Sequence, residues 1–131
     1  MNALHQYQKV NTQTSIVDAD PHRLIQLLYN GALERINMAK ARIQAKDFEG
    51  KNRLINKSIE IVAGLRGFLN FEKGGDLAPK LEALYDYMER RLFEANVRND
   101  TAMLDEVSML LRQLKDGWDG IREEVLNNRL V

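Results

Sequence analysis

Apolar residues recur three and four positions apart in four long segments of the chain, and the segments are separated by short polar connections. This spacing places the apolar side chains on one face of a helix. The predicted helices cover residues 21–45, 48–70, 77–97 and 101–126. Their clearest stripes are Leu24, Leu28, Ala32 and Ile36; Ile55, Val62, Leu65 and Leu69; Leu77, Leu81, Met88 and Leu92; and Leu104, Leu111, Leu114, Trp118, Ile121 and Val125. No segment alternates apolar and polar residues between turns as a strand would, so the chain is predicted to be all-α.

Each predicted helix has a recognisable start. A carboxylate at the N-cap accepts hydrogen bonds from backbone N–H groups that lack a partner inside the helix. Proline fits the first helical turn, where a missing N–H costs little. The residues expected to serve in this way are Asp20 with Pro21, Asp47, Asp76 with Pro79, and Asn99 with Asp100. Gly74 and Gly75 are expected to end the second helix, because glycine adopts the left-handed conformation that closes helices.

Four helices of this length span roughly 30–39 Å at ~1.5 Å per residue. The connections between them are only a few residues long, so neighbouring helices must run antiparallel. The sequence therefore predicts an up-down-up-down four-helix bundle over residues 20–126.

The two ends of the chain differ from this pattern. Residues 1–19 are mostly polar, but Leu4, Tyr7 and Val10 stand three apart in them. This segment is predicted to be a mobile or short-helical arm that can lie on the bundle or leave it. Residues 127–131 are expected to fray.

Composition narrows the class of protein. The 131 residues are 44% hydrophobic and 29% charged, as expected of one globular domain. Nineteen Lys and Arg balance nineteen Asp and Glu, which argues against a nucleic-acid partner, because such binding needs excess cations. No leader-like segment and no apolar run approaching the ~20 residues of a membrane span occurs. We expect a cytoplasmic protein with no membrane insertion.

The chain offers little catalytic chemistry. It contains no cysteine and only two histidines, His5 and His22, so neither a metal site nor a bound cofactor is expected. Serines are few and no phosphate-binding glycine loop is present, so we expect no enzyme. One alternative is a histidine phosphotransfer bundle, which would require an exposed His22. The simpler interpretation is that His22 is a solvated residue in the first turn of its helix.

Some helices carry more apolar side chains than one core face needs. Tyr29 and Leu33 form an i, i+4 pair beside the core line of the first helix. Tyr85 and Tyr87 lie ~200° apart on the third helix and cannot both face the core. Met103, Met109 and Leu110 flank the stripe of the fourth helix. Wide core faces explain each residue taken alone, whereas together they favour surface grooves that receive a partner helix.

An ordered set of segments resembles the FliS family of flagellin-specific export chaperones. It comprises Asp20-Pro21-His22-Arg23-Leu24-Ile25, Leu28-Tyr29-Asn30-Gly31-Ala32, Glu72-Lys73-Gly74-Gly75, Leu84-Tyr85-Asp86-Tyr87-Met88, Arg90-Arg91-Leu92, Ala95-Asn96 and Asn99-Asp100. In the arm, Leu4 and Tyr7 resemble the apolar residue and tyrosine of that family. The similarity spans about residues 4–122.

The resemblance implies a helical bundle that binds the disordered C-terminal segment of flagellin in apolar grooves. Such binding prevents premature polymerisation and assists delivery to the flagellar type III export apparatus. The implied partners are flagellin and a component of the export gate, and a second copy of the chain in a weak homodimer is a further candidate. The arm would act as a lid on the groove and as an export docking element through Leu4 and Tyr7.

The residues expected to contact flagellin come from the first and third helices: Leu24, Leu27, Leu28, Tyr29, Leu33, Tyr85 and Met88. Two other classes of protein remain open at this point. The phosphotransfer bundle predicts an exposed His22. A purely structural helical oligomer predicts that a second copy fills the grooves, which would double the mass in solution.

Overall fold

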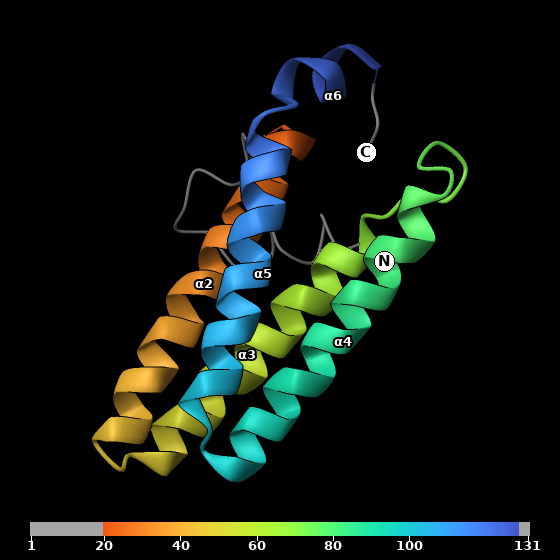
Figure 1. Cartoon of the computed structure of the whole chain (residues 1–131). Coiled ribbons are helices and arrows are strands. Elements are labelled where there is room, and N and C mark those ends of the chain that lie inside the picture. The colour runs from red at the N-terminus through yellow and green to blue at the C-terminus, as the bar shows by residue number, and fades with distance from the viewer. Residues whose placement is uncertain (1–19, 129–131) are drawn as a thin grey trace.

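A computed structural model describes residues 20–128, and this part of the chain is helical as predicted (Figure 1). The helices are α2 (Pro21–Gln44), α3 (Phe48–Gly67), α4 (Leu77–Arg98), α5 (Thr101–Asp119) and α6 (Arg122–Asn128). The predicted arm of residues 1–19, with Leu4, His5 and Tyr7, lies outside the described residues. So do residues 129–131.

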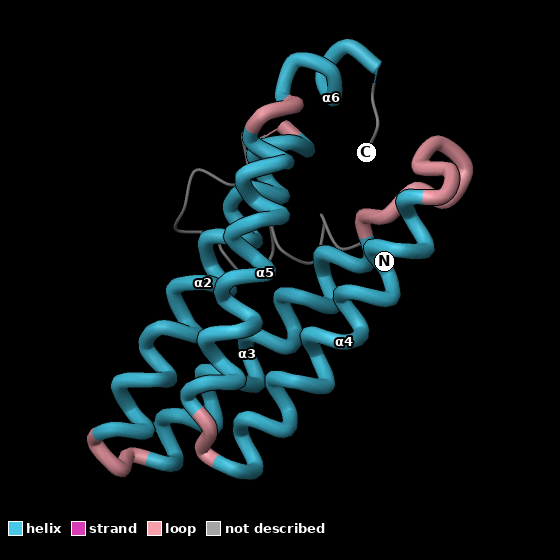
Figure 2. Tube along the Cα trace, viewed as in Figure 1, coloured by secondary structure: helices cyan, strands magenta, loops and turns pink. Residues whose placement is uncertain are grey.

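The four long helices form a closed ring. α2 packs on α3 and α5, and α4 packs on the same two helices. Consecutive helices run antiparallel, as the predicted up-down-up-down bundle requires (Figure 2). One end holds the connections 45–47 and 99–100, and we call it the closed end. The other holds connection 68–76, residues 120–121 and α6, and we call it the open end (Figure 1).

Three of the four predicted N-caps are confirmed. The Asp20 carboxylate accepts from the backbone N–H of Arg23 at 2.8 Å, and Asp47 accepts from Gly50 at 3.0 Å. Asp100 accepts from the N–H groups of Ala102 and Met103. The prediction for Asp76 is wrong. Its side chain makes no capping bond because its backbone is already helical (φ −71°, ψ −18°), whereas an N-cap is normally extended.

Two predicted helix ends are also wrong, both at the open end. The second helix stops at Gly67 and not at residue 70, so Gly74 and Gly75 lie in a connection and do not close it; Gly75 has φ +51°. The predicted helix 101–126 is two helices, because α5 ends at Asp119 and α6 starts at Arg122. Gly120 lies at this break as the C-cap of α5, and glycine has a low tendency to continue a helix.

The core lies between the four long helices and contains most of the predicted stripe residues. Its fully enclosed members include Ala32 and Ile36 of α2, Ile55 and Val62 of α3, Met88 and Leu92 of α4, and Leu104, Val107 and Leu111 of α5. This continuous apolar interior fixes the helices against one another, and so determines which side chains remain uncovered at the open end.

Candidate partner-binding surface

A mostly apolar cavity of about 250 Å³ lies at the open end of the bundle. Its lining comes from connection 68–76, the first turns of α4, the last turn of α5 and the residues between α5 and α6. The residues are Phe68, Leu69, Asn70, Lys73, Gly74, Leu77, Ala78, Leu81, Trp118 and Ile121. Small cavities of this kind bind apolar groups of a partner.

Large apolar side chains are exposed in the cavity lining and in the connection beside it. Leu77, at the start of α4, is 61% exposed, and Phe71 in connection 68–76 is 50% exposed. Leaving such groups in water costs roughly 25 cal/mol for each Å² that a partner would cover. Clustered apolar exposure beside a cavity is typical of an interaction surface.

Trp118, one wall of the cavity, is held by His22 of α2. The two rings stack with centroids 4.8 Å apart and planes 11° apart. The indole N–H donates to the carbonyl oxygen of His22 at 3.0 Å, and His22 Nε2 bonds the carbonyl oxygen of Trp118 at 2.6 Å. Packing and hydrogen bonds therefore both join the N-terminus of α2 to the last turn of α5.

The prediction that His22 is solvated is wrong, since the residue has no exposed surface. The phosphotransfer alternative required an exposed His22, and the burial of His22 contradicts that requirement. Periodicity placed His22 in a first turn, which is normally solvated. The pattern could not show that Trp118 and α6 fold over this turn.

Arg122 of α6 completes the group around His22. Its guanidinium bonds both carboxylate oxygens of Asp20 and donates to His22 Nδ1 at 3.2 Å. The Arg122 hydrogen bond, together with the backbone bond from Arg23, lowers the pKa of Asp20. We call Asp20, His22, Trp118 and Arg122 the His22 cluster.

Most of the residues predicted to contact flagellin lie in the core. Leu24, Leu28, Tyr29, Tyr85 and Met88 are all at most 4% exposed. In this conformation they support the helices and offer a partner almost no surface. Leu27 and Leu33 are half-buried and remain accessible on α2. None of the seven predicted residues lines the cavity.

Tyr29 and Tyr85 meet inside the bundle, with their hydroxyl oxygens 2.6 Å apart. Burial raises the pKa of both phenols above the ordinary tyrosine value. The expectation that Tyr29 lies beside the core line is therefore wrong. The expected divergence of Tyr85 and Tyr87 is confirmed, because Tyr87 is partly exposed and donates to Glu106 at 2.7 Å.

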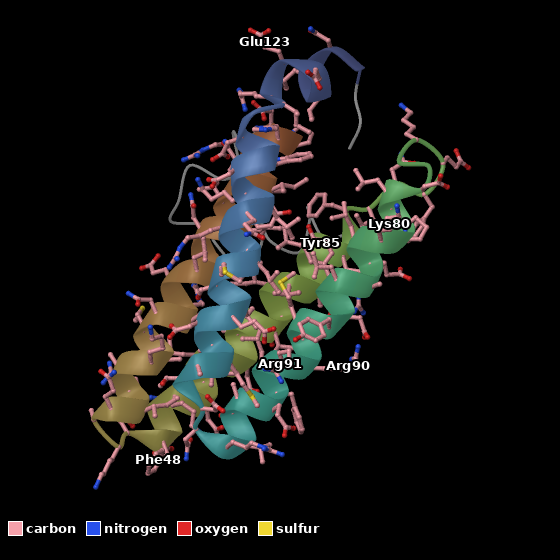
Figure 3. The ribbon with its side chains drawn as sticks, in the orientation of Figure 1. Phe48, Lys80, Tyr85, Arg90, Arg91 and Glu123 are labelled. Atoms are coloured by element: carbon pink, nitrogen blue, oxygen red, sulfur yellow. The ribbon has the colours of Figure 1, made fainter. Side chains whose placement is uncertain are left out.

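Several residues that line the cavity were present in the predicted stripes but were interpreted as core residues: Leu69, Leu77, Leu81, Trp118 and Ile121. All belong to the outermost turn or two of a helix or to the connection beside it. In an antiparallel bundle the ends of neighbouring helices lie at the same end of the molecule. The position of these residues at helix ends was therefore the sequence signal that could have indicated the cavity. Figure 3 labels Lys80 and Glu123 at the open end and Phe48 at the closed end.

Other exposed apolar side chains are spread over the bundle: Met38, Phe48, Phe93, Val97, Met109 and Leu126. Over residues 20–128 no group of three or more potential metal ligands comes together. Within the same range no helix has the length and apolar character needed to cross a membrane. The cavity is therefore the candidate site that the geometry favours.

Comparisons with known proteins give a consistent result. A family model described as "Flagellar protein FliS" matches residues 3–125. The flagellar secretion chaperone FliSB of Pseudomonas aeruginosa is 51% identical over 92% of this chain and 96% of its own length. The flagellar secretion chaperones FliS of Vibrio cholerae and Bacillus subtilis are 38% and 40% identical, over 95% and 81% of this chain and 92% and 78% of their own lengths. These relatives are named as chaperones, which are not a class of enzyme.

Proposed function

The chain belongs to the FliS family, and on that premise we propose that it is a cytoplasmic flagellar secretion chaperone whose client is the C-terminal segment of flagellin. Binding would keep that segment from polymerising early and would assist its delivery to the export apparatus. The observation that carries the proposal is the apolar cavity at the open end, where the lining residue Leu77 is exposed and Phe71 is exposed in the adjoining connection.

The size of the cavity limits its role. A disordered segment that folds on binding must offset about 2–5 kcal/mol of ordering by burying on the order of 1,000–3,000 Å². A volume of about 250 Å³ holds a few side chains and not a whole segment. We therefore assign the cavity to anchor one apolar stretch of the client. The remainder would lie along the outer surface of α2, where Leu27 and Leu33 are accessible.

The roles of the arm belong to the same proposal. Leu4 and Tyr7 would form a displaceable lid over the apolar surface and would also dock to a component of the export gate. Their three-residue spacing in a polar segment supports this assignment. Replacing Tyr7 with Ala should then change either client affinity or export, and an effect on neither would remove the lid from the proposal.

The test is calorimetric titration with the C-terminal segment of flagellin from the same organism. We expect sub-micromolar binding with a large negative heat-capacity change. Leu77→Asp places a charge at the rim of the cavity and should weaken binding by about tenfold or more. The matched control is Phe93→Asp, which changes an equally exposed apolar residue of the same helix, α4, near the closed end.

Absence of binding by the folded wild-type protein would contradict the proposal. Equal losses from Leu77→Asp and Phe93→Asp would contradict the assignment of the client to the cavity. Light scattering of the free protein distinguishes the structural oligomer, because a stable dimer with filled grooves would have twice the monomer mass. A weak homodimer that dissociates when flagellin is added agrees with the proposal.

A further inference from the structure

We propose that His22 is a positioning residue for partner binding, because it fixes Trp118 and Ile121 as walls of the open-end cavity. This inference rests on the proposed function, since it concerns the same cavity. His22 does not line the cavity itself. It would act through Trp118, which it contacts directly, and through Arg122, which adjoins Ile121 in the chain.

The partners of His22 specify where its ring carries a proton. A guanidinium can only donate, so Nδ1 must accept the bond from Arg122 at 3.2 Å. A carbonyl oxygen can only accept, so Nε2 must donate to Trp118 at 2.6 Å. The ring is thus one neutral tautomer that bridges α6 and α5. The position requires a donor and an acceptor side by side, which an aliphatic side chain of similar size lacks.

The bond from Nε2 also caps α5. The carbonyl of Trp118 is one of the last four of that helix, which have no partner within the helix, and its local partner is the N–H of Ile121 just beyond the end. His22 supplies a donor from another helix and holds the indole by stacking and through its own carbonyl oxygen. Without His22, we expect the terminal turn of α5 to loosen and the indole to leave its position at the cavity.

Ile121, the second wall of the cavity, also depends on His22. Ile121 lies between Trp118 and Arg122 in the chain, and its N–H bonds the Trp118 carbonyl at 3.2 Å. Arg122 is held by Asp20 and by His22 Nδ1. Both sides of Ile121 are therefore joined to the first residues of α2. Partner affinity should respond to changes at His22 although His22 is buried and cannot touch the partner.

Trp118 is the only tryptophan in the sequence. Tryptophan fluorescence and the tryptophan bands of the near-ultraviolet circular dichroism spectrum therefore report on this wall of the cavity. We would compare His22→Gln with His22→Leu. The glutamine amide offers a donor and an acceptor side by side, whereas leucine keeps bulk and removes both hydrogen bonds. Far-ultraviolet circular dichroism and urea unfolding would establish that each variant is folded.

For His22→Leu we expect a weaker near-ultraviolet tryptophan signal, a red-shifted emission and about tenfold weaker binding of the flagellin C-terminal segment. For His22→Gln, which restores the two hydrogen bonds but not the ring stacking, we expect a tryptophan signal and an affinity between those of wild type and His22→Leu. A general loss of stability would lower the affinity of both variants. A smaller loss for glutamine, which reproduces the hydrogen bonds, than for leucine therefore points to the hydrogen bonds of His22.

Arg122→Met provides a second test that removes no core side chain and serves if His22→Leu does not fold. It removes the donor to Nδ1 and should move the Trp118 signal and the affinity in the same direction as His22→Leu. Arg53→Met is the control, because Arg53 is an exposed cation near the closed end.

Wild-type affinity in a folded His22→Leu or Arg122→Met variant would overturn the inference. An unchanged Trp118 signal in either variant would overturn it as well. If the wild-type protein bound no flagellin segment, the proposed function would fail. The tryptophan signals would still show whether His22 fixes the orientation of the Trp118 indole.

Discussion

The helices are connected differently at the two ends of the bundle. At the closed end, connections of three and two residues join α2 to α3 and α4 to α5. Lys46 and Asn99 adopt left-handed conformations there, with φ 58° and 54°, and Asp47 and Asp100 cap the following helices. Turns of this kind satisfy the backbone groups within the turn itself.

A buried lysine adds to the closed end. Lys51 of α3 donates to the carbonyl oxygen of Asn96, in the last turn of α4, at 2.8 Å. Its Nζ also lies 5.7 Å from the centre of the Phe48 ring, and burial lowers the pKa of this lysine. The side chain thus supplies a donor to a helix end that has few partners of its own.

At the open end the corresponding groups come from distant parts of the chain. Connection 68–76 is longer, Asp76 makes no capping bond, and the last turn of α5 is held by His22 in addition to its local backbone bonds. The helix ends consequently stand apart, and apolar side chains line a cavity between them. The comparison indicates that local capping closes one end, whereas incomplete local closure leaves the other able to receive a partner.

The largest expected effect comes from one substitution made at both ends. Leu104→Ala, in the first turns of α5 at the closed end, should lower the free energy of unfolding by about 2–5 kcal/mol, because the leucine is fully buried. Leu77→Ala, in the first turn of α4 at the open end, should cost under about 0.5 kcal/mol, because its side chain is 61% exposed. Urea unfolding measures both, and equal losses would show that the open end is packed like the closed end.

The tyrosine pair, about two turns inside the open end, should give the next largest effect. Tyr29→Phe leaves the Tyr85 hydroxyl buried without its partner and should cost about 1–3 kcal/mol. The double variant Tyr29→Phe with Tyr85→Phe should cost less than the sum of the single variants, because it removes both hydroxyls together. Additive losses in this double-mutant cycle would contradict a direct bond between the two phenols.

The N-caps provide a smaller and more local test. Asp100→Ala at the closed end removes the acceptor for two backbone N–H groups and should cost about 1 kcal/mol. Asp76→Ala at the open end removes no capping bond and should change stability by less than about 0.5 kcal/mol. If Asp76→Ala proved as costly as Asp100→Ala, the contrast in capping between the ends would be lost.

The smallest effect is expected at the His22 cluster. Asp20→Asn keeps a good N-cap but removes the charge that faces Arg122, and the pair is partly exposed, so the loss should be under about 1 kcal/mol at neutral pH. The Arg122 hydrogen bond lowers the pKa of Asp20 in the folded state. Its contribution is therefore present above the carboxyl's ordinary pKa and is lost as the pH falls through the lowered value. As the pH falls from about the ordinary carboxyl pKa through the lowered value, wild-type stability should approach that of Asp20→Asn, and parallel curves would exclude this linkage.

The sequence predicted the elements more reliably than their ends. The long stripes predicted four helices correctly because each stripe records the face that tertiary packing buries. Asp20, Asp47 and Asp100 were predictable as caps because a cap depends on neighbours in the chain. Asp76 failed because its backbone conformation is set by the whole connection 68–76, and the break after Asp119 depends on how α6 meets Asp20.

The candidate site was harder to predict, because core and surface positions use the same residue types. Leu28 and Tyr85 were selected as contact residues from apolar excess, yet both lie in the core. Trp118 and Ile121 were assigned to a core stripe, yet both line the cavity. A period of 3.6 residues identifies the apolar face of a helix but does not show how far along that face the neighbouring helices reach.

The sequence by itself determined the all-α class, the antiparallel order of the four long helices and the resemblance to the FliS family. All three follow from local spacing, short connections and the order of motifs along the chain. Only the tertiary structure decided that His22 is buried, that Trp118 is a wall and not a core residue, and that the cavity lies at one end of the bundle. Those features depend on contacts between residues more than ninety positions apart, and no local pattern in the chain encodes such contacts.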